Sequence, residues 1–318
     1  MDDNAVFTLT AEEHVRTRAI ADRLTVAPPR RVDDPAWVDT CRTASAGLPR
    51  RLRERLAAFR RDPGTYGALL VCNLPGAAER PTPTVPGSVE REATPGAAVL
   101  GMVAMQLGEV IAYRNEKSGA LVQNVVPVPG QETQQSNAGS TPLEMHVENA
   151  FHPRRPDYVG LLCVRADHER IAGLQVGCIR RAVHDLPADV RAVLSQPRFT
   201  TQAPPSFGRF DDATAAHAVL TGEPTDPDVQ VDFHATYGND TDAKNALEVL
   251  RESMVAVTET LVLRPGDLAL VDNRVALHGR TLFTPRYDGR DRWLYRTFVH
   301  LDLRRSRAMR EVDGHVLA

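Results

Sequence analysis

The sequence lacks the features that mark membrane-spanning, exported and nucleic-acid-binding proteins. No apolar run approaches the length of about 18 residues that crosses a membrane, so we expect no membrane partner. The start, MDDNAVFTLTAEEH, is acidic and has no long apolar stretch, which argues against a signal peptide. The formal net charge of −3 gives no general reason to expect nucleic acid as a partner.

Cysteine is scarce and scattered. The four cysteines, Cys41, Cys72, Cys163 and Cys178, form no CxxC pair and do not resemble a disulfide framework. We therefore expect reduced, mostly buried thiols and a cytoplasmic protein.

The remaining composition is typical of a soluble globular protein with many loops, with 42% hydrophobic residues, 25% charged residues and 23 prolines. The periodicity of apolar residues predicts helices over 11–24 after a Thr10 cap, 96–107, 186–195 and 242–257, the last one capped by Thr241, and a helical block over 34–61. Short, valine-rich segments that predict strands dominate 109–170 and 229–303. The polar stretch 199–229 shows no period, and the polar segment 130–139 suggests a mobile loop.

This distribution predicts an α+β protein with a mainly β core of two sheets, of the jelly-roll type, with N-terminal and inserted helices. The length of 318 residues suits one large domain or two, and we expect a single domain over 1–318. We expect a helical N-terminal buttress with one strand over 1–93 and a jelly-roll core over 94–305. A helical and loop insertion would interrupt that core over 183–228, and a tail would follow over 306–318.

A metal site is suggested by His146 and Glu148, which are two residues apart between apolar neighbours. In an extended strand both side chains point to the same face and can bind one metal ion. Two histidines and one carboxylate with open positions are typical of non-haem Fe(II) oxygenases. About one His-x-[Asp/Glu] pair is expected by chance in a chain this long, so a half-buried histidine beside a solvated glutamate is the alternative.

His278 is the best third ligand, because it lies in a predicted strand after the tight turn at 265–267. Other histidines lie in a charged turn, near a helix, before a proline or in the tail: His168, His184, His152 and His315. Arg292 follows in the last predicted strand, and its planar guanidinium can bind a carboxylate through two hydrogen bonds. An oxygenase of this kind needs such a cation for the distal carboxylate of 2-oxoglutarate. Arg296 lies on the same face of that strand.

Three segments now resemble a known family: LEMHVENAFHPRRPDYVGLLCVRAD, PGDLALVDNRVALHGR and YDGRDRWLYRTFV. They are similar to the clavaminate synthase-like family of Fe(II)/2-oxoglutarate oxygenases, and most to its amino-acid β-hydroxylases, which act on free asparagine or arginine. The likeness covers roughly 94–305.

The resemblance implies a distorted jelly roll, or double-stranded β-helix, with Fe(II) bound by His146, Glu148 and His278. It also implies that Arg292 holds 2-oxoglutarate, with O2 as the other cosubstrate. Four further residues would contact the substrate at its α-amine, backbone groups, α-carboxylate and side chain, and these are Glu116, Asn137, Arg296 and Asp232, in that order. Arginine hydroxylases of this family tend to carry a second acid where this chain has Gln230, so a neutral amide suits the pocket at least as well as a guanidinium.

We therefore expect a 2-oxoglutarate-dependent non-haem iron dioxygenase that hydroxylates a free polar L-amino acid at Cβ. The substrate would be asparagine-like or arginine-like, and the setting natural-product (antibiotic) biosynthesis. Another amino acid or a carrier-tethered one is the alternative within this class. A zinc hydrolase and a non-catalytic metal-binding jelly roll are alternatives outside it, but a hydrolase would leave Arg292 without a role and has no evident general base.

Overall fold

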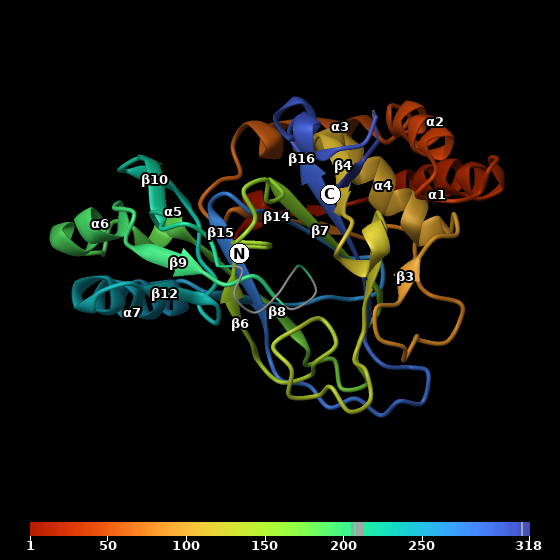
Figure 1. Ribbon diagram of the computed structural model, residues 1–318. Coiled ribbons are helices and arrows are strands. Elements are labelled where there is room, and N and C mark those ends of the chain that lie inside the picture. Colours follow the sequence, from red (N-terminus) through yellow and green to blue (C-terminus); the bar gives the residue numbers. More distant parts are fainter. Residues whose placement is uncertain (205–206, 208–212, 313) are drawn as a thin grey trace.

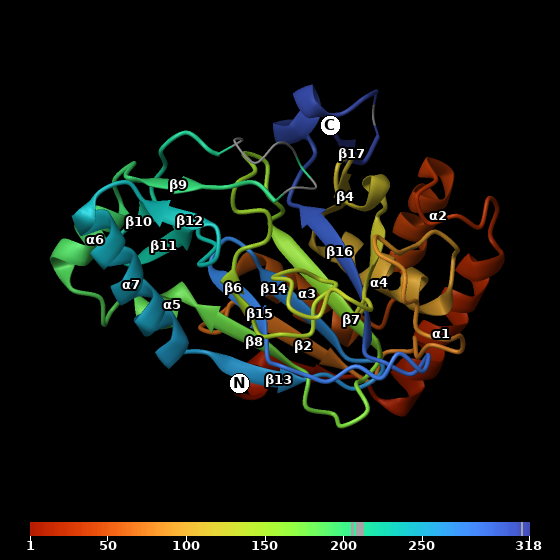
Figure 2. The same cartoon turned by 60° about the horizontal axis from the view of Figure 1, so that its bottom comes forward.

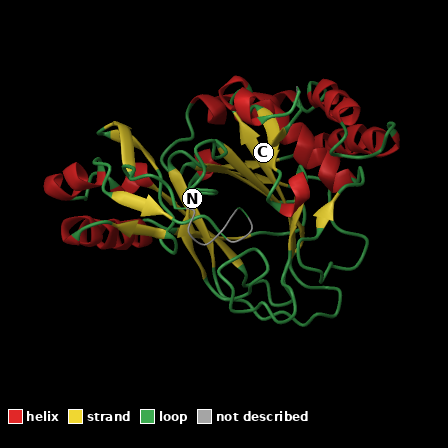
Figure 3. Ribbon diagram, in the orientation of Figure 1, coloured by secondary structure: helices red, strands yellow, loops and turns green. Residues whose placement is uncertain are grey.

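The computed structural model describes residues 1–204, 207, 213–312 and 314–318. It combines helices with two larger β-sheets of nine and four strands. The helices gather at two opposite ends of the molecule, and the strands of the two sheets lie between them (Figure 1, Figure 3). Within the described part of the chain, no helix is both long and apolar enough to cross a membrane.

Four N-terminal helices form one end of the molecule: α1 (Ala11–Val26), α2 (Pro35–Ser45), α3 (Arg50–Arg61) and α4 (Pro95–Leu107). Helix α4 is almost wholly buried and packs on the larger sheet, while the other three pack on α4. The predicted start of α1 is confirmed, because the Thr10 hydroxyl accepts a hydrogen bond from Glu13 and the Glu13 carboxylate accepts one from the Thr10 N–H. The helical block predicted over 34–61 is confirmed and contains two helices, since Pro49 has no N–H to continue a helix and instead precedes α3.

The larger sheet is built around β16 (Trp293–His300), which pairs antiparallel with β7 (Tyr158–Arg165) along nearly its whole length. Strand β14 (Leu268–Asp272) follows on the other side of β7. The remaining strands extend the sheet on both sides, namely β1 (Val6–Thr8), β2 (Ala68–Cys72), β3 (Val89–Glu90), β4 (Glu109–Tyr113), β5 (Val122–Val125) and β17 (Val316–Leu317). Three of them lie within 1–93, where one strand was predicted. Short 3₁₀ turns cover Asp3–Ala5, Lys117–Gly119 and Arg304–Met309.

The alternation of side chains along β14 divides the interior into two cores. Leu268 and Leu270 pack with the N-terminal helices, whereas Ala269 and Val271 pack toward the second sheet. This is the two-residue period of a strand that is buried on both faces. All four cysteines are free, and Cys72 alone is partly exposed rather than buried.

The smaller sheet has the order β13 (Glu259–Val262), β8 (Gly173–Cys178), β15 (Ala276–Arg280) and β6 (Leu143–His146). Its strands cross the foreground of Figure 2, in front of the larger sheet. The sequence analysis missed β8, whose glycines obscure the strand pattern. Glycine is required there, because a Cβ on Gly173 would lie 2.3 Å from Cγ2 of Thr260 on the neighbouring β13.

The other end of the molecule is an insertion made of short elements: α5 (Ile179–Ala182), α6 (Ala188–Leu194), β9 (Phe199–Thr201), β10 (Leu220–Glu223), β11 (Asp226–Val229), β12 (Thr236–Gly238) and α7 (Thr241–Ala256). No regular structure was expected over 199–229, but β9, β10 and β11 lie within this stretch. Residues 205–206 and 208–212 lie outside the described part of the chain. The strand predicted over 229–238 is split between β11 and β12. Helix α7 is capped by Asp240, not Thr241, since the Asp240 carboxylate accepts from the Ala243 N–H.

Candidate active site

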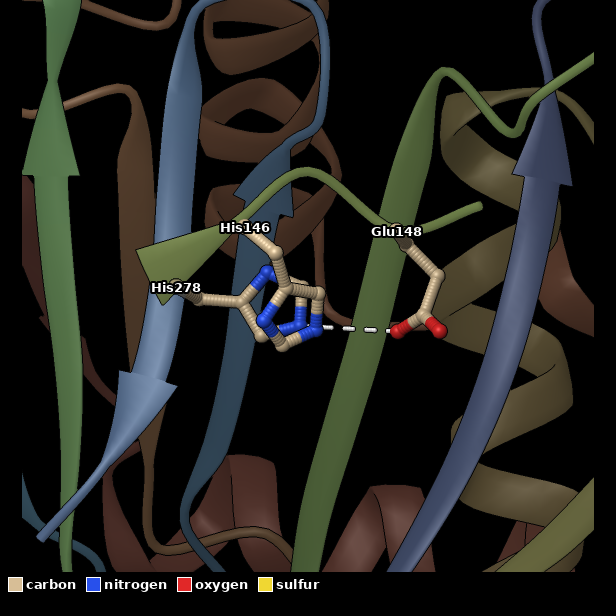
Figure 4. A group of neighbouring side chains, drawn as sticks. All are labelled: His146, Glu148 and His278. Atoms are coloured by element: carbon tan, nitrogen blue, oxygen red, sulfur yellow. Dashed lines mark ion pairs between the residues drawn. The ribbon is translucent and has the colours of Figure 1, made fainter. Parts of the chain in front are cut away.

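The two predicted histidines face each other across a strand pair. His146 ends β6 and is the direct antiparallel partner of His278 in β15, with their ring centroids 4.5 Å apart. Glu148 follows two residues after His146 and turns toward the rings (Figure 4). One possible ligand atom from each of the three residues lies within 4.8 Å of the others. The predicted group is therefore brought together from three separate positions.

Asn273 fixes the backbone that carries Glu148. This fully buried amide accepts a hydrogen bond from the Glu148 N–H at 2.6 Å and donates to the Glu148 carbonyl at 3.1 Å. It also donates to the carbonyl of Pro156. Directly after Glu148 the chain takes a left-handed conformation at Asn149, with φ of 53°, which asparagine tolerates better than most residues. Sequence reasoning missed Asn273, although it lies in the distinctive segment 265–280.

The protonation states suit a divalent metal ion. Burial, followed by the nearby His146, lowers the pKa of His278, so this imidazole stays neutral. Burial opposes ionisation of Glu148, but the charge of Arg296 outweighs it and holds the pKa of Glu148 well below its usual range. Nδ1 of His146 lies 2.8 Å from the Glu144 carbonyl, which leaves its Nε2 for a ligand.

Buried polar atoms in this group lack partners. Oε2 of Glu148 makes no hydrogen bond with the described residues, although Nε2 of His278 lies 3.4 Å away. Two imidazoles and one carboxylate, with a carboxylate oxygen left unpaired among the described residues, are the donor set that non-haem Fe(II) binds. The residues present therefore fit the metal. A second metal-capable group, His168, Asp288 and Asp291, fits less well, because Asp288 is exposed and Asp291 already accepts the N–H groups of residues 286 and 287.

Arg296 lies beside this group and is already neutralised. The buried guanidinium donates to Oε1 of Glu148 at 2.8 Å and also to Glu116 and to Gln123. With its amide oxygen turned inward, Asn137 accepts from both terminal nitrogens at 3.0 Å. Burial lowers the pKa of Arg296, but the two glutamates outweigh this and raise it overall. Glu116 lies in the turn after β4, and burial raises its pKa.

Arg292 is buried with no counter-charge in contact. It immediately precedes β16 and is 6% exposed, and it forms no hydrogen bond or ion pair with any described residue. Its guanidinium carbon lies 5.8 Å from the centre of the Phe283 ring. Burial lowers the pKa of Arg292. A buried guanidinium without an anion is costly, so this position calls for an anionic ligand.

A cavity of about 430 Å³ collects six of the eight predicted residues on its wall: Glu116, Asn137, His146, Glu148, Asp232 and Arg296. His278 and Arg292 are buried but do not line it. The wall also holds residues that the sequence analysis missed, among them Asn149, Phe151, Gln202, Phe207, His234 and Tyr237. Several of these follow Glu148 or lie in the long polar stretch that starts at residue 199, and such a stretch is itself a signal of function.

Asp232 is held beside His146 by strand-like pairing. The Val147 N–H donates to the Val231 carbonyl and the Phe233 N–H donates to the Met145 carbonyl, so this segment adds to the edge of β6. Oδ1 of Asp232 accepts from the N–H groups of residues 234 and 235, at 2.8 and 3.2 Å. Oδ2 is without a hydrogen bond to the described residues and is available to a ligand. Burial alternates here as in a strand, with Val231 and Phe233 buried and Asp232 less so.

Gln230 is fully engaged by protein groups. Its Oε1 accepts from Nη1 of Arg155 at 2.9 Å, and its Nε2 donates to the carbonyl of Ala150 at 2.7 Å. Arg155 is largely buried, and burial lowers its pKa. Position 230 therefore contributes a neutral amide that is bonded to the cation of Arg155. A second carboxylate at this position would instead favour a cationic substrate.

Comparison with known proteins agrees with this geometry. Residues 97–298 match the family described as taurine catabolism dioxygenase TauD, TfdA family. The chain is 50% identical to L-asparagine oxygenase of Streptomyces coelicolor over 312 residues, which cover 98% of this chain and 94% of the relative. It is 34% identical to clavaminate synthase 2 of Streptomyces clavuligerus over 291 residues, 89% of each chain.

A solved structure is similarly close. Asparagine oxygenase in complex with Fe(II), 2S,3S-3-hydroxyasparagine and succinate superposes with a TM-score of 0.96 at 50% identity, covering 98% of this chain and 99% of that one. The resemblance inferred from three sequence segments is thus confirmed over nearly the whole length. The chain belongs to the TauD/TfdA family of dioxygenases, together with L-asparagine oxygenase and clavaminate synthase.

Proposed function

We propose that this protein is an Fe(II)/2-oxoglutarate-dependent dioxygenase that hydroxylates free L-asparagine at Cβ. His146, Glu148 and His278 hold the iron, and 2-oxoglutarate and O2 are the cosubstrates. The observation that carries the proposal is the buried His–Glu–His group beside a cavity where Asp232 offers one unused carboxylate oxygen. Iron bound there would activate O2, of which one oxygen atom enters the C–H bond as a hydroxyl group and the other enters succinate as 2-oxoglutarate loses CO2. The protein positions the substrate and excludes water.

We further propose that the two larger sheets are the layers of a distorted jelly roll, or double-stranded β-helix, within a single domain over 1–318. The facing of His146 and His278 across β6 and β15 supports this, since it places the metal group on the smaller sheet. Arg292 and Arg296, at the start and middle of β16, then approach the same group from the larger sheet.

The polar wall of the cavity favours a neutral amide over a cation. Oδ2 of Asp232 is a single acceptor suited to one N–H of a carboxamide. A guanidinium or ammonium group would need further negative charge near Asp232, but Gln230, which lies two residues before it and outside the cavity wall, is neutral and is held by Arg155. An aspartate side chain would meet Asp232 as a like charge, which costs several kcal/mol away from water.

The Arg296–Glu116 ion pair suits a free amino acid. A zwitterion that enters between them can give its ammonium group to Glu116 and its carboxylate to Arg296. Two new ion pairs then replace the one that is lost, and no buried charge is left alone. An amino acid tethered through its carboxyl group would break the original pair without offering Arg296 a replacement. Asn137, beside Arg296, is placed to contact the substrate backbone.

Arg292 holds the distal carboxylate of 2-oxoglutarate in this proposal. It is the one predicted site residue that is cationic and yet has no hydrogen bond or ion pair to the described residues. A carboxylate in that position would supply a bidentate, charge-assisted partner.

Succinate release tests the proposal directly. Purified protein with Fe(II), ascorbate and 2-oxoglutarate is supplied in turn with L-asparagine, L-aspartate, L-arginine, L-lysine and asparagine methyl ester. We expect L-asparagine to stimulate succinate formation most and to gain one oxygen atom at Cβ by mass spectrometry and NMR. Stronger turnover of arginine or of aspartate would refute the asparagine assignment. A zinc hydrolase or a non-catalytic protein would release no succinate with any of them.

A further inference from the structure

A third arginine, Arg280, faces the same region and was not among the predicted site residues. It lies two residues after His278 in β15, so its side chain points to the same face of the sheet as that histidine. The residue is 4% exposed. With the described residues it forms no ion pair, and its Nε has no hydrogen-bond partner. A carboxylate to neutralise it is therefore missing from the described part of the fold.

Arg280 and Arg292 share one aromatic ring. The guanidinium carbons of Arg280 and Arg292 lie 5.6 and 5.8 Å from the centre of the buried Phe283 ring. Two like charges held beside one buried ring repel each other, and neither has an ion pair with the described residues. The π-face of Phe283 offsets only a small part of that repulsion. Two buried cations around one point match the charge of a dicarboxylate.

The same guanidinium also holds the loop that carries Asn137. Nη1 of Arg280 donates to the carbonyl of Ser136 at 3.2 Å, and Nη2 donates to the carbonyl of Thr141 at 2.9 Å. The Phe283 N–H donates to the Ser140 carbonyl, which ties the loop to the same aromatic residue. Ser136 and Asn137 line the cavity, and Asn137 contacts Arg296. Arg280 is thus bonded to both ends of the segment 136–141.

We propose that Arg280 is a positioning residue that couples the two ligand subsites. Together with Arg292 it forms the cationic surround of dianionic 2-oxoglutarate, and through the carbonyls of Ser136 and Thr141 it holds Asn137 against Arg296. This inference rests on the proposed function. Binding of the dianion relieves the repulsion between the two arginines, which fixes the Arg280 side chain and therefore the loop that it holds. The cosubstrate in this way prepares the place of the amino acid without touching it.

Hydrogen exchange on the unaltered protein gives the first test, with Mn(II) in place of iron so that no turnover occurs. We expect 2-oxoglutarate to slow amide exchange in peptides that cover 131–142. Binding of 2-oxoglutarate is followed in parallel by calorimetry. If the compound does not bind, the proposed function fails. If it binds and the exchange of 131–142 stays unchanged, the proposed function stands and the coupling is refuted.

Two variants then separate charge from geometry. Arg280→Gln removes the charge and the fork, so we expect 2-oxoglutarate to bind at least about 10-fold more weakly, as for a lost charged hydrogen-bonding group, and its protection of 131–142 to disappear. Arg280→Lys keeps the charge but cannot span two carbonyls, so 2-oxoglutarate affinity should fall less while loop protection is still lost. Arg181→Gln is the control, because Arg181 also donates to a backbone carbonyl, that of Val257, and pairs with Glu259, away from the cavity. Wild-type affinity and wild-type protection in both Arg280 variants would overturn the proposal.

Discussion

Asp232→Asn tests which substrate side chain the cavity accepts. In the wild type, Oδ1 of Asp232 is occupied by two backbone N–H groups, from His234 and Ala235. The amide oxygen of the substituted side chain can take over both hydrogen bonds, so the turn and the pairing beside His146 keep their shape. The amide nitrogen then replaces Oδ2, the one oxygen available to a ligand. The substitution therefore exchanges a charged acceptor for a neutral donor at nearly constant shape.

The expected magnitude follows from this exchange. Losing one buried hydrogen bond to a charged group costs about 1.5–3 kcal/mol, which is roughly 10- to 150-fold in kcat/KM for L-asparagine. The repulsion of an aspartate side chain disappears at the same time, and the new N–H groups can donate to its carboxylate. Turnover of L-aspartate should therefore rise from background while turnover of L-asparagine falls. The ratio of the two specificity constants reports the change better than either one alone.

The assay is substrate-dependent succinate release, with hydroxylated products identified by mass spectrometry. Asp302→Asn is the matched control, because the Asp302 carboxylate also accepts from the N–H groups two and three residues further on, yet it is exposed and remote from the cavity wall. The control should leave the ratio unchanged. An unchanged ratio in Asp232→Asn as well would mean that Asp232 is an ordinary turn residue and that another part of the wall selects the side chain.

Three further predictions concern the metal, the cosubstrate and acid stability. His278→Ala should abolish both stoichiometric Fe(II) binding in equilibrium dialysis and turnover, whereas His168→Ala should keep both; retained iron in the first would exclude His278 as a ligand. Arg292→Lys keeps the charge but loses the planar fork, so the KM for 2-oxoglutarate should rise far more than the KM for the amino acid, and the reverse pattern would mean that Arg292 contacts the amino acid. Burial lowers the pKa of fully buried His300 from 6.5 to about 4, so its contribution to stability is complete above pH 6.5 and is lost as the pH falls toward 4. Between pH 6.5 and pH 4 the unfolding free energy of the wild type should therefore decrease by roughly 3 kcal/mol more than that of His300→Gln. Parallel pH profiles of the two proteins would contradict this.

The metal group could be predicted because its geometry is local. His146 and Glu148 are two residues apart, so a nearly extended chain brings them together, although Glu148 lies in the turn after β6 and is held there by Asn273. His278 required only that its strand pair with the first one. The four substrate residues, in contrast, came from the family resemblance, since no local pattern distinguishes Glu116 or Asp232 from other acids. Asp232 reaches His146 through an isolated bridge between distant segments, which propensity does not reveal.

What the sequence could not reveal depends on contacts that have no local signature. Strand β8 carries Gly173 and Gly177 because neighbouring threonines leave no room for a Cβ, so tertiary packing overrides β propensity there. Asn273 holds Glu148 across 125 residues of sequence, as a buried amide that from the sequence alone could be any turn residue. The break between β11 and β12 occurs where Asp232 bonds to its own following residues and leaves the strand geometry.

The three arginines around the site differ in what neutralises them, and this difference assigns the ligands. Arg296 is paired with Glu116 and Glu148, so only a ligand that brings both charges can enter without leaving a charge unpaired. Arg292 has no ion pair within the described structure, and Arg280 has only backbone carbonyls. Each unpaired buried cation destabilises the ligand-free protein, since its desolvation is not repaid by a counter-charge. A zwitterion at Arg296 and a dianion between Arg292 and Arg280 are the combination that leaves no charge uncompensated. Exchange of the two ligands would leave cations unpaired at one place and bring excess anions to the other, so the charges of these side chains support the proposed placement of the amino acid at Arg296 and of 2-oxoglutarate at Arg292.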